Sequence, residues 1–243
     1  MKLLILALAL LLSQSAFAAD SVKVKKLKKG KDVDTVKVAT PPPAPQAPLF
    51  TDIIPQPLSL VKGEGRFTLD DSSAIICEKG LEKAADYLRL YLPIERTKGK
   101  KSNSIQLQLD KMLGKEEYSL SVGEKGIIIR GGDYGGVFNG IQSLLQLLPH
   151  EIYSKSATLP MELSYIEVKD APQYHCRGFL LDVARTFQPV HEVKRVLDYM
   201  AFCKLNKLHF HLVDNPAWRI EIKKYPHFAE QGGFRGGDAK LHP

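Results

Sequence analysis

The chain has 243 residues, of which 44% are hydrophobic, 25% charged and 8% aromatic. This composition excludes collagen, a continuous coiled coil and a wholly disordered chain, and it supplies enough apolar side chains for more than one core. The formal net charge of +7 comes largely from residues 19–48, where seven Lys face only three Asp, so the rest of the chain is nearly neutral and does not indicate a nucleic-acid-binding domain.

The first 18 residues have the pattern of a secretory signal peptide. Lys2 gives a positive start, Leu3–Leu12 is an unbroken apolar run, and Ser13–Ala18 ends in the small residues that signal peptidase recognises. The apolar run is shorter than the roughly 20 residues that a membrane-spanning helix needs. The sequence therefore predicts an exported protein, periplasmic or extracellular, that is cleaved near Ala18 and has no transmembrane span.

Residues 19–48 combine a Lys-rich segment with five Pro between positions 41 and 48. Such a segment buries too little apolar area to fold, and its Pro residues favour an extended spacer. We expect a solvated tether here. The alternative interpretation is a basic arm that contacts anionic polymers of the cell envelope.

Residues 49–170 are predicted to form an α+β accessory domain, with helices packed on a sheet. Alternating segments predict strands over residues 74–77, 105–109, 118–122 and 127–130. Apolar residues at helical spacing predict one helix that runs from Leu81 to Leu92 and is ended by Pro93. A second helix is predicted between a cap at Asp133 and a stop at Pro149.

Residues 171–243 follow a different pattern. Phe179–Val183 is a strongly apolar strand, a helix follows with Val193, Val196, Leu197 and Met200 on one face, and Lys207–Val213 is a second strand. This order predicts a βαβ unit with parallel strands, which belongs to a doubly wound sheet or to a (β/α)8 TIM barrel. A glycine-rich phosphate loop does not follow the first strand, which disfavours a nucleotide-binding sheet.

Polar residues gather where these two strands end: Asp182 and Arg185 after the first, and Asp214 and Asn215 after the second. The carboxyl ends of parallel strands form the functional edge in both architectures. His209 and His211 alternate with Phe210 and so share one face of their strand. Two interpretations remain open for this pair: the first ligands of a metal site, or hydrogen-bonded residues of a polar barrel interior.

Four segments carry a resemblance to a known family: Arg177–Arg185 (RGFLLDVAR), Lys204–Asn215 (KLNKLHFHLVDN), Trp218–Pro226 (WRIEIKKYP) and Gly135–Leu148 (GGVFNGIQSLLQLL). They resemble the family 20 glycoside hydrolases, the β-N-acetylhexosaminidases. The resemblance implies an accessory domain followed by the first βαβ unit of a TIM barrel, truncated in this chain. Asn215 departs from the family, which usually has a second acid there.

The resemblance also implies the roles of individual residues. Arg177 would hold the terminal GlcNAc or GalNAc through its ring hydroxyls, and Asp214 would accept hydrogen bonds from the sugar. The alternative for Arg177, which begins its strand rather than ending it, is a salt bridge at the barrel floor. Asp182, Arg185 and His211 would lie at the active-site rim, and neither a metal nor an organic cofactor is implied.

The family removes terminal N-acetylhexosamines by substrate-assisted, retaining hydrolysis, with an adjacent Asp and Glu on a later strand. We find no such pair in this sequence, and we therefore expect the 243 residues by themselves to be inactive. Two other functions remain open: a non-catalytic glycan-binding protein of the cell envelope, and a metal-dependent barrel hydrolase that uses His209 and His211. The expected partners are glycans that end in N-acetylhexosamine; the oligomeric state is left open.

Overall fold

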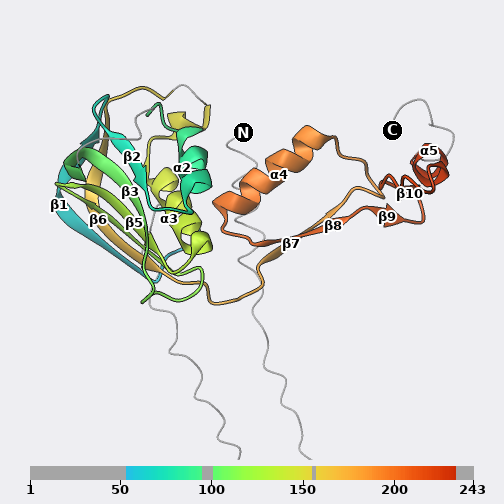
Figure 1. Cartoon of the computed structure of the whole chain (residues 1–243), viewed down its shortest axis with the longest axis horizontal. Helices are drawn as coiled ribbons and strands as arrows, with labels where there is room; N and C mark the ends of the chain where they lie inside the picture. Colours follow the sequence, from blue (N-terminus) through green and yellow to red (C-terminus); the bar gives the residue numbers. More distant parts are fainter. Residues whose placement is uncertain (1–52, 95–100, 155–156, 234–243) are drawn as a thin grey trace, which may run out of the picture. The chain divides into compact units, whose positions relative to one another are not determined.

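The computed structural model describes residues 53–94, 101–154 and 157–233, all of which lie within one compact unit, residues 49–243. The predicted signal peptide and tether fall outside the described residues. The described part contains a six-stranded sheet with helices on it, followed by a βαβ unit (Figure 1). None of its helices is long and apolar enough to cross a membrane.

The six-stranded sheet has the order β1-β6-β4-β5-β3-β2. The pairs β1–β6, β6–β4 and β4–β5 are antiparallel, whereas the pairs β5–β3 and β3–β2 are parallel. The strands are β1 (Ser59–Leu69), β2 (Ala74–Cys77), β3 (Ser104–Leu109), β4 (Tyr118–Gly123), β5 (Gly126–Gly131) and β6 (Met161–Asp170). Alternation decides which face is buried: in β4, Tyr118, Leu120 and Val122 are buried, and the Ser residues between them are partly exposed.

Two helices cover one face of this sheet, α2 (Glu82–Arg89) and α3 (Tyr134–Leu147) (Figure 1). The predicted cap of α3 is present, because Asp133 Oδ1 accepts a hydrogen bond from the backbone N–H of Gly136 at 2.8 Å. Its apolar stripe is buried against the sheet: Val137, Ile141, Leu144 and Leu145 are at most 1% exposed. Short 3-10 turns precede β3 (Lys101–Asn103) and follow α3 (His150–Ser154).

The first helix is shorter than predicted. Helix α2 ends at Arg89, and the chain turns before Leu92, which nevertheless lies in the core at 1% exposure. The sequence analysis also missed β1 and β6, which pair along one edge of the sheet. Strand β1 escaped notice because its first half is exposed and carries glycine and charged residues around an irregularity between Lys62 and Arg66.

The βαβ unit consists of β7 (Gly178–Asp182), α4 (Val190–Phe202) and β8 (Lys207–His211), with β7 and β8 parallel as predicted. The second strand ends earlier than expected. Val213–Asp214 forms a separate short strand, β9, that pairs antiparallel with β10 (Ala217–Trp218). A short helix, α5 (His227–Gly232), follows, and its Phe228 stacks on Trp218 with ring centroids 4.8 Å apart.

Burial differs sharply between the two regions. The large hydrophobic core consists of residues between Ile53 and Val168, in the accessory domain. In the βαβ unit the side chains of Phe179, Leu180 and Phe210 are 43%, 54% and 38% exposed. Two parallel strands cannot cover both of their own faces, so this unit has the open surfaces expected of an incomplete barrel.

Candidate active-site edge

The carboxyl ends of β7 and β8 bring together four side chains that the sequence placed at the functional edge. Asp182 ends β7 and pairs in register with His211, which ends β8. Arg185 bridges two carboxylates: its Nη1 lies 2.6 Å from Asp182 Oδ2 and its Nη2 lies 2.5 Å from Asp214 Oδ2. His211 Nε2 lies 2.9 Å from the same Asp214 oxygen. The four residues therefore form one connected polar cluster, the edge cluster.

Both carboxyls of the edge cluster accept hydrogen bonds that lower their pKa values. The backbone N–H of Arg185 is the main cause that lowers the pKa of Asp182, and the Arg185 side chain adds to it. The backbone N–H of Asn215, followed by the hydrogen bond from His211, lowers the pKa of Asp214. Both groups are therefore ionised at neutral pH. Because a carboxylate only accepts, the His211 nitrogen nearest to Asp214 is the donor.

His209 does not join this cluster. Its ring centroid lies 6.1 Å from that of His211, and its side chain is exposed. Within the described ranges, no three His, Cys, Asp or Glu side chains are grouped so that they could hold a metal ion. The hydrogen bond between His211 and Asp214 is what the second interpretation, a hydrogen-bonded residue of a polar barrel interior, expects of His211.

Arg177 lies at the other end of β7. At a rise of about 3.3 Å per residue, Arg177 lies roughly 16 Å along the strand from Asp182, at the end opposite to the edge cluster. The Arg177 guanidinium donates to the backbone oxygens of Lys204 and Tyr174, each at 2.8 Å, and lies 3.1 Å from Glu116 Oε2. These contacts match the alternative interpretation, a salt bridge at the start of the strand.

Glu116 and Asn206 complete a partly buried polar group around Arg177. The side-chain Nδ2 of Asn206 donates to both carboxylate oxygens of Glu116, at 3.1 and 3.2 Å. Burial acts to raise the pKa of Glu116, but hydrogen bonds from Arg177 and Asn206 outweigh it and lower the pKa below its ordinary value. Glu116 belongs to the accessory domain and its partners to the βαβ unit, so this group joins the two.

A second buried group lies beside it. Lys204 is 6% exposed, and its Nζ lies 3.0 Å from the Tyr118 hydroxyl and 3.2 Å from Asp170 Oδ2. Burial lowers the pKa of Lys204 and raises that of Tyr118. The Tyr118 hydroxyl also lies 2.6 Å from Ser143 Oγ. Every polar side chain of this group therefore has partners, as a buried ion pair requires.

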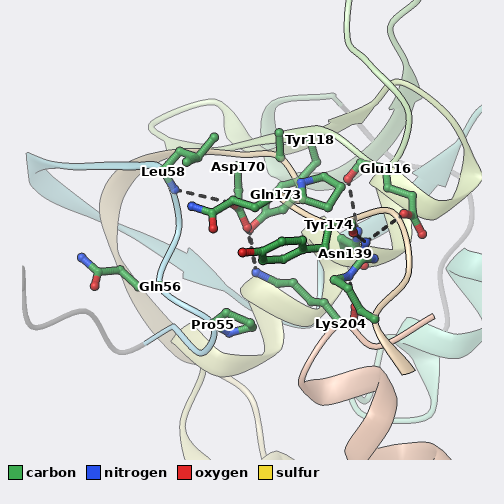
Figure 2. A pocket seen from close by; sticks show the side chains of 13 residues that line it. Pro55, Gln56, Leu58, Glu116, Tyr118, Asn139, Asp170, Gln173, Tyr174 and Lys204 are labelled. Atoms are coloured by element: carbon green, nitrogen blue, oxygen red, sulfur yellow. Dashed lines mark hydrogen bonds and ion pairs between the residues drawn. The ribbon is translucent and has the colours of Figure 1, made fainter. Parts of the chain in front are cut away.

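A cavity of about 270 Å³ lies between these groups and the chain segments 55–58 and 170–174. Figure 2 shows Asp170 on its wall, with contacts to the backbone of Leu58 and to the Lys204 side chain. The charged side chains that line the cavity form two ion pairs, Glu116 with Arg177 and Asp170 with Lys204, so their charges cancel within each pair. The cavity lies at the start of β7, and not at the carboxyl ends where parallel α/β folds place their chemistry.

The sequence analysis gave no role to Glu116, Asp170, Lys204 or Asn206. Glu116 follows Lys115 in a charged turn that resembles any solvated loop. Lys204 and Asn206 lie inside one of the family motifs, which was the one available signal. Their contacts join residues that are far apart in the sequence, so spacing alone could not pair them.

Two protein-family models match consecutive parts of the chain. The model of "Glycosyl hydrolase family 20, domain 2" matches residues 51–171, and that of "Glycosyl hydrolase family 20, catalytic domain" matches residues 174–241. The two matches meet close to Asp170, where the sequence analysis ends the accessory domain.

Similar proteins are described as beta-hexosaminidases or as family 20 enzymes. A beta-hexosaminidase from Porphyromonas gingivalis is 41% identical over 196 residues, which are 76% of this chain and 25% of that protein. A Streptomyces coelicolor family 20 beta-N-acetylhexosaminidase has a TM-score of 0.70 at 31% identity, over 76% of this chain and 40% of that one. A Vibrio harveyi family 20 exo beta-N-acetylglucosaminidase in complex with N-acetylglucosamine has a TM-score of 0.68 at 31% identity, over 79% and 30%.

The chain thus spans between a quarter and two fifths of the length of these relatives. The parts it shares with them are an accessory domain and the first strands of a barrel. The chain belongs to glycosyl hydrolase family 20, of which it carries domain 2 and the short start of the catalytic domain.

Proposed function

We propose that these residues belong to an exo-acting β-N-acetylhexosaminidase that removes terminal GlcNAc or GalNAc from glycans, and that the edge cluster contacts the terminal sugar. The observation that carries the proposal is the position of Asp182, Arg185, His211 and Asp214 at the carboxyl ends of strands in a family 20 catalytic domain. The relative whose structure holds N-acetylglucosamine supports the choice of sugar.

Arg185 and Asp214 are the proposed sugar-binding residues. The Arg185 side chain is 60% exposed, and the two carboxylates beside it fix the orientation of its guanidinium. A planar guanidinium next to a carboxylate offers donors and acceptors together, which suits vicinal hydroxyls because each hydroxyl both donates and accepts. Asp182 and His211 keep this pair in place. Arg177 is assigned to the junction with the accessory domain instead.

The proposed hydrolysis is substrate-assisted. The oxygen of the 2-acetamido group attacks the anomeric carbon and the bond to the leaving oxygen breaks, while an acidic side chain of the enzyme protonates that oxygen; water later opens the cyclic intermediate. Asp182 and Asp214 have lowered pKa values and are carboxylates at neutral pH, so neither supplies the proton. The proposed role of these two carboxylates is therefore to bind the sugar, and the proton comes from another residue.

Two experiments test this assignment. With an aryl N-acetylglucosaminide as substrate, the 243 residues should give no turnover above a buffer blank, and turnover that Asp214→Asn abolishes would place the chemistry on Asp214 and refute the assignment. NMR titration of the same chain with N-acetylglucosamine should shift the Arg185 and His211 signals. If neither signal moves at millimolar sugar, the edge cluster is not the sugar site.

A non-catalytic glycan-binding protein is the second candidate, favoured by an edge cluster whose two carboxyls are both ionised at neutral pH and therefore bind without donating a proton. The aryl glycoside assay of the complete natural protein distinguishes the two, because only the enzyme turns the substrate over. We also propose export through residues 1–18, which would bring the protein to glycans of the cell envelope or the surroundings.

A further inference from the structure

Glu116 lies in the accessory domain but is directed at the start of the catalytic strands. Its backbone is in the left-handed region, with φ of 58°. Two contacts hold it there: its N–H donates to Asp133 Oδ1 at 3.1 Å, and its carbonyl accepts from Asn139 Nδ2 at 3.1 Å. Since Asp133 also caps α3, the Glu116 backbone is fixed to a helix of the accessory core. The backbone from which the carboxylate extends is thus held within the accessory domain.

The partners of this carboxylate are the residues that come directly before β7 and β8. Asn206 Nδ2 donates to Glu116, and Asn206 Oδ1 accepts from the backbone N–H of Arg177 at 3.0 Å. The Arg177 carbonyl in turn accepts from the backbone N–H of Asn206 at 2.9 Å. Asn206 and Arg177 immediately precede the first in-register pair of the two strands, Gly178 with Lys207. Glu116 therefore holds the residues from which the pairing of β7 and β8 starts.

This pairing decides whether the edge cluster exists. In the observed register Asp182 lies opposite His211, which contacts Asp214. A shift of one residue would place Asp182 opposite Phe210 or Leu212 and would turn the side chains of the shifted strand to the other face.

We propose that Glu116 is a positioning residue for the edge cluster: from the accessory domain, it fixes the register of β7 against β8 through Asn206 and Arg177. The inference rests on the proposed function only in taking the edge cluster as the sugar site. It assigns to the accessory domain a task in the catalytic domain that its own fold does not reveal.

Hydrogen exchange measured by mass spectrometry on the 243-residue chain tests the proposal, because exchange reports the opening of individual strands. In Glu116→Gln, peptides from β7 and β8 should exchange about tenfold faster or more, because an ionic hydrogen-bond acceptor is lost. Peptides from β4 and β5 should keep their wild-type rates. Glu124→Gln, in the exposed turn between β4 and β5, is the matched control and should behave as wild type.

Unchanged exchange in β7 and β8 of Glu116→Gln would overturn the proposal, as would a wild-type chain in which these strands have no protection. If Glu116→Gln also opens β4 and β5, Asn206→Ala decides, because Asn206 lies outside the accessory core. That variant should open β7 and β8 alone, and the proposal fails if it does not.

A readout of position accompanies the exchange measurement. The imidazole NMR signals of His211, assigned with His211→Gln, should move in Glu116→Gln although Glu116 does not touch His211, and should stay in place in Glu124→Gln. Titration with N-acetylglucosamine separates the two claims. Faster exchange and a moved His211 signal, without any response to sugar in the wild type, would support positioning and remove the proposed function. A response of the wild type to sugar, with unaltered exchange in Glu116→Gln, would support the proposed function and refute the positioning role of Glu116.

Discussion

Replacing Lys204 by Met removes one half of a buried ion pair while keeping a side chain of similar length. In the native chain the Lys204 ammonium lies between Asp170 and the Tyr118 hydroxyl, and 94% of the residue is buried. The variant would leave the Asp170 carboxylate with the Tyr118 hydroxyl at 3.2 Å and the Leu58 N–H at 3.4 Å. These contacts do not supply a positive charge.

Removing one partner of a buried ion pair costs about 3 to 5 kcal/mol. The Asp170 side chain is 14% exposed and keeps its neutral donors, so we expect the lower end, about 3 kcal/mol, for Lys204→Met. Lys204 also has a left-handed backbone, with φ of 57°. Met keeps a side chain on the same backbone position, so the loss in Lys204→Met reports the ion pair and not this strain.

Urea unfolding followed by fluorescence measures these losses. Trp218 is the single Trp of the chain and stacks on Phe228, so its emission reports the region that follows β8. Circular dichroism follows the accessory domain in the same samples. The double variant Lys204→Met with Asp170→Asn also removes the unpaired carboxylate charge. Its loss in free energy of unfolding should be about 2 kcal/mol smaller than the sum of the losses in the single variants.

Two results would refute this reasoning. A loss below about 1 kcal/mol in Lys204→Met would mean that water or another cation compensates Asp170. Strict additivity in the double variant would mean that the two groups do not interact, whatever their distance in the structure.

Further predictions concern the two arginines, Glu116 and the signal peptide. Arg185→Lys should weaken N-acetylglucosamine binding at least tenfold with little change in melting temperature. Arg177→Lys should instead lower the melting temperature and leave sugar binding by the folded protein intact. The reverse pattern would mean that Arg177, and not Arg185, binds the sugar. Because the pKa of Glu116 is lowered in the folded state, its stabilising contribution is present above its unfolded pKa of about 4.5 and is lost as the pH falls through the folded value. The difference in Trp218 unfolding midpoint between wild type and Glu116→Gln should therefore disappear in acid, and a difference that persists at pH 2 would contradict this. Intact-mass measurement of the exported protein should show a start after Ala18 or the residue that follows it, and a product that still begins at Met1 would disprove the signal peptide.

The sequence by itself determined the elements whose signals are local. The cap at Asp133 and the apolar spacing that follows it predicted α3, because both signals act within a few residues of the chain. The apolar strands on either side of an amphipathic helix predicted β7, α4 and β8 for the same reason. The order of polar residues after each strand placed Asp182, Arg185 and Asp214 at one edge, since parallel strands end together.

Only the tertiary structure decided the pairing of distant residues. Strand β1 became recognisable through its partner β6, because its exposed half has little apolar alternation of its own. The ion pair of Arg177 likewise depended on a residue 61 positions earlier, Glu116, whose charged turn looks solvated in the sequence. Contacts of this kind join residues from two regions of the chain. Removing the charges from water costs free energy, which their mutual attraction and hydrogen bonds must offset, and no local pattern of residues records that balance.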